Sequence, residues 1–188
     1  MKIISGKHRS RIIKYHKSET TRPTSNMVRE GVFNMLSDIT DFTVLDLFAG
    51  SGQYGLEALS RGAKHVYFND IDRKNVKLIK ENIKSLNEEL NATVHNLDYE
   101  KAINHYENNN LKFDLIFIDP PYFKGIYENV IKLILPRLNE TGVIIIEISK
   151  TLDLDLSNFN IEILKDRNYG SKRILIITSI SCVNVKCC

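Results

Sequence analysis

The sequence has few cysteines, and none of them is placed to bind a metal or to build a disulfide framework. The three cysteines, Cys182, Cys187 and Cys188, all lie in the last seven residues. They form no C-x-x-C pair and have no histidine near them. We therefore expect no metal site, and we expect residues 181–188 to be a flexible tail.

The sequence also lacks a long apolar run. Its start, MKIISGKHRSR, contains no apolar stretch of signal-peptide length, and its longest apolar runs, such as residues 143–146, have the length of a strand. We therefore expect a cytoplasmic protein that does not associate with a membrane.

Net charge is small but unevenly distributed. The whole chain carries +3, whereas residues 1–30 contain eight Lys or Arg and two Glu, so that this segment carries +6 and the remainder −3. A local excess of positive charge favours a polyanion as partner. The alternative is an ordinary solvated surface without a partner.

Length and periodicity predict one α/β domain preceded by an extension. The 188 residues suffice for one domain with a full hydrophobic core. Residues 1–6 and 9–16 alternate as in a basic β-hairpin, and residues 27–39 have helical periodicity after an N-cap at Thr24 or Ser25. We expect three parts: an extension over 1–38, a domain over 39–180 and the tail over 181–188.

From residue 43 onward, strand and helix patterns alternate. Continuous Val, Ile and Leu strands separated by helices are typical of a parallel sheet covered on both faces. Two close strands joined by a turn over residues 166–171 then predict an antiparallel hairpin at the sheet edge. The expected fold is a doubly wound, Rossmann-like, mostly parallel sheet of seven strands. The expected strands are 43–48, 65–69, 92–96, 113–119, 142–148, 160–165 and 172–178, and the expected helices of this domain are 56–61, 73–90, 100–107 and 127–138.

The stretch LDLFAGSGQYG, residues 45–55, follows the first of these strands. Gly50, Gly52 and Gly55 fit the G-x-G-x-x-G of dinucleotide-binding proteins. Asp70, about twenty residues after Gly50, is placed to accept hydrogen bonds from ribose hydroxyls. A nicotinamide cofactor would satisfy both features.

Asp46, four residues before Gly50, does not belong to the dinucleotide pattern. A dinucleotide brings a pyrophosphate to this turn, and a carboxylate would repel it strongly at low effective dielectric. S-adenosylmethionine carries no phosphate, and its ammonium and sulfonium charges are attracted to a carboxylate. Asp46 therefore favours S-adenosylmethionine, and the simpler alternative is that Asp46 caps a helix.

Asp98, after the third strand, has two interpretations. It lies where an acceptor would reach the amino group of an adenine, and also where a helix beginning near residue 100 needs an N-cap. The sequence leaves both open.

The fourth strand ends in Asp119-Pro120-Pro121-Tyr122. Two prolines fix φ and donate no backbone hydrogen bond, so the turn is stiff and the carbonyl of Pro120 is an available acceptor. The exocyclic amino group of a nucleobase is a poor nucleophile, because its lone pair is delocalised into the ring. Asp119 and the Pro120 carbonyl would hold both amino hydrogens, and Tyr122 would stack on the base for about 1–3 kcal/mol. The alternative is a turn that only ends a strand and caps a helix.

These two motifs together are similar to those of class I S-adenosylmethionine-dependent methyltransferases that act on amino nitrogens. The chain resembles the RsmD family in particular, bacterial methyltransferases that modify the 2-amino group of a guanine in small-subunit ribosomal RNA. The resemblance implies the class I methyltransferase fold, S-adenosylmethionine as cofactor, ribosomal RNA or an assembling small ribosomal subunit as partner, and a monomer. It covers nearly the whole chain through TRPTS at 21–25, REGVFNML at 29–36, VLDLFAGSG at 44–52, LEALSRGA at 56–63, DPPY at 119–122 and NYGSKRILII at 168–177.

Carried over by position, the resemblance implies a cofactor group and a catalytic group of site residues, and we add to them a group expected to contact RNA. The cofactor group is Asp46, Phe48, Ala49, Gly50, Ser51, Gly52, Asp70, Ile71 and Asp98. The catalytic group is Asp119, Pro120, Pro121 and Tyr122. The RNA group, which includes the basic extension, is Lys7, Arg9, Arg11, Arg22, Thr24 and Tyr169.

Three departures from the family pattern affect these expectations. Gln53-Tyr54 replaces a small apolar pair, which we expect to change the rim of the cofactor pocket. Asp72 competes with Asp70 as the ribose ligand. Lys172 stands where threonine is usual, and is expected to be either a phosphate contact or a surface residue.

Three alternative functions remain. The Asp-Pro-Pro-Tyr turn also suits an adenine amino methyltransferase acting on RNA or DNA. The glycine pattern suits a nicotinamide-dependent oxidoreductase. A non-catalytic RNA-binding protein that keeps the scaffold is the third, and the intact Asp-Pro-Pro-Tyr motif argues against it.

Overall fold

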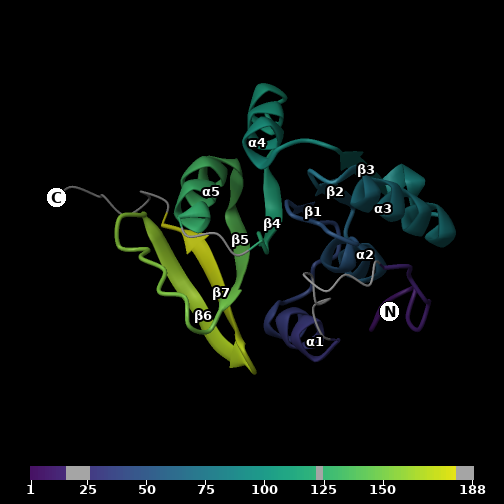
Figure 1. The fold of residues 1–188 in the computed structure, drawn as a ribbon, viewed down its shortest axis with the longest axis horizontal. Coiled ribbons are helices and arrows are strands. Elements are labelled where there is room, and N and C mark those ends of the chain that lie inside the picture. The colour runs from purple at the N-terminus through teal and green to yellow at the C-terminus, as the bar shows by residue number, and fades with distance from the viewer. Residues whose placement is uncertain (16–25, 122–124, 181–188) are drawn as a thin grey trace.

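A seven-stranded sheet forms the centre of the protein, which the computed structural model describes over residues 1–15, 26–121 and 125–180 (Figure 1). The strand order is β3-β2-β1-β4-β5-β7-β6. The strands β1 to β5 run parallel, and β7 is antiparallel to β5 and β6. The predicted doubly wound sheet with an antiparallel edge hairpin is therefore confirmed. The strands are β1 (Thr43–Asp46), β2 (His65–Asn69), β3 (Ala92–His95), β4 (Phe113–Ile118), β5 (Leu138–Ser149), β6 (Ile161–Tyr169) and β7 (Lys172–Ser179).

Helices cover both faces of the sheet, because its central strands are apolar on both sides and need a partner on each. On one face α1, α2 and α3 pack around Phe68 and Phe117. On the other face α4 and α5 pack around Phe113 and Ile116. The helices are α1 (Asn26–Met35), α2 (Gln53–Ser60), α3 (Arg73–Leu86), α4 (Tyr99–Asn108) and α5 (Ile126–Ile134).

The helices α3 and α5 end earlier than the sequence predicts. α3 stops at Leu86 rather than near residue 90, because Asn87 adopts a left-handed conformation with φ 57° and the short turn η1 (Glu89–Asn91) follows. α5 stops at Ile134, and η2 (Leu135–Arg137) leads into β5. The proline at the second position of η2 cannot continue the hydrogen bonding of α5.

Other boundaries also differ from the predictions. α1 ends at Met35 rather than residue 39, and α2 begins at Gln53 rather than Leu56. β6 continues to Tyr169, so the turn to β7 is shorter than the predicted 166–171 and includes Gly170 with φ 60°. The predicted N-cap residues of α1, Thr24 and Ser25, lie outside the described residues, as does the predicted tail over 181–188.

Residues 1–15, which we call the N-terminal arm, fold back on themselves as the alternating pattern predicts. Lys2 and Ile12 form an antiparallel bridge, and the amide of Ile13 donates to the carbonyl of Met1 at 2.9 Å. Ile3 and Ile13 are buried in the core on the α1–α3 face. The arm is thus packed onto the domain as well as paired with itself.

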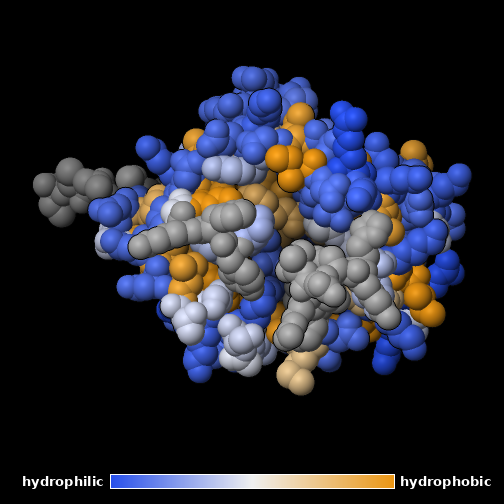
Figure 2. Space-filling view, viewed as in Figure 1, coloured by the Kyte–Doolittle hydropathy of each residue, from blue (hydrophilic) through white to orange (hydrophobic). Residues whose placement is uncertain are grey.

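Most of the face seen in Figure 2 is hydrophilic, and apolar side chains gather near its centre. In the same view of Figure 1 this central area lies over the middle strands of the sheet, between α4 and α5 on one side and α3 on the other.

Candidate active site

The carboxyl ends of β1 and β4 lie where the strand order reverses. The chain proceeds from β1 to β2 and β3 on one side, and then crosses to β4 on the other side of β1. In sheets of this kind, ligands bind outside the carboxyl ends of the strands at this reversal. Asp46 is in register with Phe117 of β4. The loop after Asp46 and the turn that begins at Asp119 therefore leave the sheet side by side, so the structure brings the two predicted motifs together.

The three glycines of the loop after β1 have different roles. Gly50 and Gly52 have φ values of 54° and 79°, a backbone conformation that residues with a side chain rarely adopt. A Cβ at Gly50 would meet nothing within 4 Å, so a ligand can approach the backbone there. A Cβ at Gly55 would lie 2.1 Å from the ring of buried Phe68. Gly55 therefore serves the close packing of α2 on β2.

Asp46 is a buried carboxyl group at the end of β1, with 3% exposure. Its Oδ2 accepts a hydrogen bond from the amide of Gly55 in the first turn of α2, at 2.9 Å, so the capping role considered above is present. Burial raises the pKa of Asp46 to about 7, and the charge of Asp70 adds to the rise, whereas the hydrogen bond from Gly55 opposes it. Within residues 1–15, 26–121 and 125–180, no cationic side chain pairs with Asp46. This site suits a cationic ligand.

Asp70 connects the end of β2 to the loop after β1. Its Oδ2 accepts from the amide of Gly50 at 2.7 Å, and its Oδ1 accepts from the amide of Asp72 at 2.8 Å. Asp72 is exposed and caps α3 by accepting from the amide of Lys74 at 2.8 Å. The position of Asp70 against the first loop favours it over Asp72 as the ribose ligand. Next to it, the side chain of Ile71 is 70% exposed and offers an apolar surface to a ring.

These features fit the sulfonium cofactor better than a dinucleotide. The loop offers open backbone at Gly50 and, at Asp46, a buried carboxyl without a cationic partner among the described residues, and Asp70 hydrogen-bonds to the same loop. A pyrophosphate at the same place would face two carboxyl groups.

Two asparagines, which the sequence analysis did not single out, hold the surrounding loops together. Asn69 is buried, and its Nδ2 donates to the carbonyls of Leu47 at 3.3 Å and Leu97 at 3.1 Å. The Nδ2 of Asn96 donates to two carbonyls of the loop after β2, both at 2.9 Å. For Asn69 the available signal was an amide side chain at the end of a buried strand, because a buried polar group requires partners.

Asp98 caps α4. Its Oδ1 accepts from the amide of Glu100 at 2.9 Å, which is one of the two interpretations open from the sequence. Contact with an adenine stays a prediction. Phe48 is half-buried, and its ring centroid lies 5.7 Å from that of Tyr99 in the first turn of α4, so Phe48 packs the loop after β1 against the start of α4.

Asp119 begins the turn after β4. Ile118 is in register with Ile146 of β5, which places Asp119 beside Glu147 on the same face of the sheet. Burial raises the pKa of Asp119 well above its usual range, and the negative charge of Glu147 adds to the rise. Within the turn, Pro120 is buried and Pro121 is exposed, whereas Tyr122 lies outside the described residues.

Glu147 is a functional candidate that the sequence reading missed. It is 1% exposed, and its Oε1 lies 2.7 Å from Nζ of Lys172. Its Oε2 accepts from the hydroxyl of Tyr54 at 2.7 Å. The Tyr54 ring stacks on Phe117 with 4.6 Å between centroids. The expectation that Tyr54 lies at the rim was therefore wrong, because Tyr54 is a core residue. Lys172 is not a plain surface residue, because it pairs with a buried carboxylate, and its contact with a phosphate stays a prediction.

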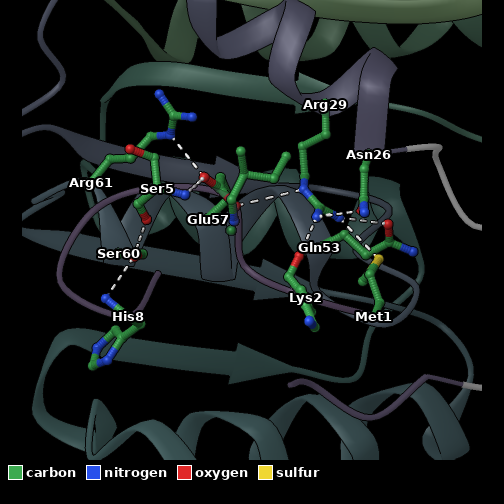
Figure 3. A network of polar contacts seen from close by, with 12 residues as sticks. Met1, Lys2, Ser5, His8, Asn26, Arg29, Gln53, Glu57, Ser60 and Arg61 are labelled. Atoms are coloured by element: carbon green, nitrogen blue, oxygen red, sulfur yellow. Dashed lines mark hydrogen bonds and ion pairs between the residues drawn. The ribbon is translucent and has the colours of Figure 1, made fainter. Parts of the chain in front are cut away.

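Buried polar side chains fasten the N-terminal arm to α2 (Figure 3). Glu57 accepts from the amides of Ile4 at 2.8 Å and Ser5 at 3.0 Å. The hydroxyl of Ser60 accepts from the amide of His8 at 3.0 Å and donates to the carbonyl of Ser5. The path of the arm is thus set by the side chains of α2.

Arg29 joins the arm, α1 and α2, as Figure 3 shows. It is 1% exposed, and its guanidinium donates to the carbonyl of Lys2 at 2.6 Å and to Asn26 Oδ1 at 3.0 Å. It also donates to Gln53 Oε1 at 3.0 Å and lies 3.7 Å from Glu57. Gln53 is therefore part of this network, and its Nε2 also donates to the hydroxyl of Ser51 in the loop after β1 at 3.1 Å, so its place at the rim of the pocket stays a prediction.

Two of the arm's predicted RNA-contact residues also hold the arm in place. Nζ of Lys7 lies 2.7 Å from the buried Glu88 while half of its side chain remains exposed, at 50%. Arg11 donates to the carbonyl of Ser85 on α3 at 2.8 Å. Arg9 is exposed. Arg22 and Thr24 lie outside the described residues.

Tyr169, the last predicted RNA contact, packs against α1. A Cβ at Gly31 would lie 2.6 Å from its ring, so Gly31 leaves the space that the ring occupies. Tyr169 is half-buried and lies against the α1–α3 core. Its ring therefore connects the turn between β6 and β7 to α1.

Among the described residues, every helix is too short or too polar to cross a membrane. The same residues contain no cluster of three or more His, Cys, Asp or Glu side chains suited to a metal ion.

The chain is similar to a known protein family and to several known proteins. The family described as conserved hypothetical protein 95 matches residues 1–178. The chain is 35% identical to the putative rRNA methyltransferase YlbH of Bacillus subtilis (strain 168), over 94% of this chain and 97% of that protein. It is 34% identical to ribosomal RNA small subunit methyltransferase D of Haemophilus influenzae, over 90% of this chain and 89% of that protein. The solved structure of the putative methyltransferase yhhF from Escherichia coli matches with a TM-score of 0.80 at 28% identity, over 95% of this chain and 97% of that chain.

Proposed function

The chain belongs to the RsmD family, described as conserved hypothetical protein 95, and we propose that it transfers a methyl group from S-adenosylmethionine to the 2-amino group of a guanine in small-subunit ribosomal RNA. The observation that carries the proposal is the convergence of Asp46 and Asp119 at the carboxyl ends of the adjacent strands β1 and β4. One carboxyl suits a cationic methyl donor, and the other suits an amino group that receives the methyl.

When bound, S-adenosylmethionine supplies a methyl group on a positively charged sulfur. In our proposal Asp46 faces this positive charge, and Asp70 accepts hydrogen bonds from the ribose hydroxyls. Ile71 contacts the adenine, whose amino group Asp98 reaches. The loop after β1 encloses the rest of the cofactor with its backbone and side-chain atoms, through Phe48, Ala49, Gly50, Ser51 and Gly52.

The Asp119 turn prepares the acceptor nitrogen. Asp119 and the carbonyl of Pro120 each accept one amino hydrogen, which turns the nitrogen lone pair away from the ring and toward the methyl group. Pro121 keeps the turn stiff, and Tyr122 stacks on the base. This alignment and the preorganised acceptors account for much of the rate enhancement.

The reaction balances without a metal or a covalent enzyme intermediate. A bond forms between the acceptor nitrogen and the methyl carbon while the carbon–sulfur bond breaks, and the sulfur keeps the electron pair. The product nitrogen then releases one proton. Asp119 accepts this proton in our proposal, because burial raises the pKa of its carboxyl above the usual range.

Residues 1–38 form the RNA-contact extension in our proposal, and residues 39–180 form the methyltransferase domain. A base in structured RNA must leave its stack to reach the crevice, and phosphate contacts offset that cost. Arg9 is exposed and half of the Lys7 side chain is exposed, so both can contact phosphates. Arg11, Arg22, Thr24 and Tyr169 complete the proposed surface.

The proposed partner is ribosomal RNA, either free or in an assembling small ribosomal subunit, and the protein is proposed to act as a monomer in the cytoplasm. The preference for guanine is supported by the resemblance to the family alone, since the Asp-Pro-Pro-Tyr turn also suits the amino group of adenine.

The test is incubation with a methyl-labelled donor and separate pools of ribosomal RNA, small-subunit particles and DNA, followed by nucleoside analysis. Label in N2-methylguanosine of the RNA is expected. Label in N6-methyladenosine would reject guanine as the target. Calorimetry provides a second check, because tight binding of NADH together with no binding of S-adenosylhomocysteine would favour an oxidoreductase.

A further inference from the structure

An ion pair with a buried carboxylate lies beside the Asp119 turn and has no part in the function proposed above. Glu147 at the end of β5 and Lys172 at the start of β7 are 2.7 Å apart, and Glu147 is 1% exposed. Burying a charge is costly unless a partner compensates it. This pair lies next to Asp119 on the neighbouring strand, so we looked to Asp119 for its role.

We propose that Glu147 and Lys172 are positioning residues that set the charge and the orientation of Asp119 for methyl transfer. This inference rests on the proposed function, since it assigns Asp119 to the reacting amino group.

The sheet register brings the three side chains together. Ile118 pairs with Ile146 in the parallel β4–β5 ladder, so the next positions, Asp119 and Glu147, are neighbours on one face. In the antiparallel β5–β7 ladder Glu147 pairs with Ile174. Lys172 lies two residues before Ile174 and therefore points to the same face, where its ammonium reaches Glu147.

Glu147 is held rigidly. Beside the ion pair, its Oε2 accepts from the hydroxyl of Tyr54 at 2.7 Å, and its backbone carbonyl accepts from the hydroxyl of Tyr127 at 3.2 Å. The Tyr54 ring is fixed in turn by stacking on Phe117 at 4.6 Å and by a contact with Phe33 at 6.4 Å. A rigid carboxylate next to Asp119 limits the positions that the Asp119 side chain can adopt.

Charged and titratable groups face Asp119 from four elements. The carboxyl groups of Glu147 on β5 and Asp46 on β1 raise the pKa of Asp119, whereas the ammonium of Lys172 on β7 lowers it. The hydroxyl of Tyr54 on α2 faces the same group. Lys172 therefore favours the ionised form of Asp119. That form has acceptors only, whereas a protonated carboxyl would present a hydrogen to the amino group.

The experiment is the pH dependence of kcat/KM for the wild type and for variants of the pair. The value of kcat/KM should fall at low pH as Asp119 becomes protonated, and we call this part of the profile the acidic limb. Lys172→Gln should move the acidic limb to higher pH by about one unit, because an opposite charge nearby shifts a carboxyl pKa by roughly this much or more. Glu147→Gln, which retains an acceptor for Tyr54, should move the limb to lower pH. Lys172→Arg keeps the charge and should retain the wild-type limb. In Lys172→Gln and Glu147→Gln, kcat should fall more than KM for the cofactor rises.

Arg173→Gln is the matched control. Arg173 follows Lys172 on the same strand and carries the same charge, but its guanidinium pairs with the partly exposed Asp166 at 2.7 Å, away from Asp119. Its removal should leave the acidic limb in place. A shift equal to that of Lys172→Gln would show that general charge is responsible, and would overturn the inference.

A direct titration separates this inference from the proposed function. The pKa of Asp119, followed by carboxyl carbon NMR in the protein without RNA or cofactor, should rise in Lys172→Gln and fall in Glu147→Gln. Binding of S-adenosylhomocysteine identifies variants that remain folded. Identical titration of Asp119 in the folded variants and the wild type would overturn the inference even if methyl transfer is found. The predicted shifts without any methyl transfer by the wild type would instead leave the inferred electrostatics intact and reject the proposed function.

Discussion

The carboxylate of Asp70 accepts a hydrogen bond from the amide of Gly50 at 2.7 Å, and this bond joins the end of β2 to the loop after β1. The same carboxylate accepts from the amide of Asp72 at 2.8 Å. Two loops that are distant in sequence therefore share one anchor. A ligand placed between them meets walls that are already fixed, which lowers the entropic cost of binding.

Asp70 and Asp72 should differ sharply in their effect on cofactor binding. Asp70→Ala should weaken S-adenosylhomocysteine binding by roughly 10- to 100-fold, the value of about 1.5–3 kcal/mol for hydrogen bonds to a charged group. Asp72→Asn is the control, because asparagine also caps helices well and α3 should remain intact. Calorimetry of both variants tests the assignment. A larger loss for Asp72→Asn than for Asp70→Ala would exchange the two roles.

Asp46 should make the stability of the unliganded protein depend on pH. Burial raises its pKa from the ordinary 3.8 to about 7, so the folded state binds this proton more tightly than the unfolded chain does. Its contribution is therefore fully present below pH 4 and is lost as the pH rises from about 4 to 7, by up to a few kcal/mol. Asp46→Asn should flatten this part of the curve when urea unfolding is measured across that range.

The same substitution should weaken binding of S-adenosylmethionine, because the neutral amide no longer attracts a cation. Unchanged affinity in Asp46→Asn would show that Asp46 only caps α2 through Gly55.

Asp119 should matter for turnover and not for cofactor binding. Asp119→Ala removes one of the two acceptors for the amino hydrogens, and we expect a loss of roughly 100-fold or more in kcat, the scale of a lost preorganised contact in other active sites. Affinity for S-adenosylhomocysteine should remain within about twofold. Single-turnover methylation and calorimetry on the same preparation separate the two effects. Loss of cofactor binding would place Asp119 in the cofactor site instead.

The arm should contribute phosphate contacts. Replacing Arg9 and Arg11 together with Gln should weaken RNA binding and reduce the slope of log affinity against log salt by roughly 1–2, since each phosphate contact contributes about 0.7–0.9. Lys132→Gln serves as control, because Lys132 is exposed on α5, which covers the opposite face of the sheet. Equal slopes for the wild type and the double variant would remove the arm from the interface.

Glu57 should hold the arm to α2. Glu57→Ala leaves the amides of Ile4 and Ser5 and the buried Arg29 without their carboxylate, and removal of one partner of a buried pair costs about 3–5 kcal/mol. Urea unfolding measures this loss, and hydrogen exchange should show faster exchange at both amides. Unchanged exchange at Ile4 and Ser5 would mean that the arm is held by its apolar contacts alone.

The positions of Asp46, Asp70 and Asp119 were predictable, because carboxyl ends of parallel strands meet at one edge and each of these residues lies at the end of a predicted strand or directly after it. The Glu147–Lys172 pair was not. It depends on the register of β5 against β7, and a slip of one residue would turn Lys172 to the other face.

The charge of the first thirty residues was overestimated as a surface feature. Arg29 is 1% exposed and binds partners in the interior, and half of the Lys7 side chain is covered where it pairs with Glu88. Composition counts charges and does not show which of them the fold uses, because the partners, such as Glu57 and Glu88, lie far along the chain.

The central claim is methylation of a guanine in small-subunit ribosomal RNA, and the most direct measurement is methylation mapping of that RNA from cells with and without the protein. One N2-methylguanosine should be absent in cells without it, and should return with the wild-type protein but not with Asp119→Ala. Retention of every N2-methylguanosine in cells that lack the protein would contradict the account.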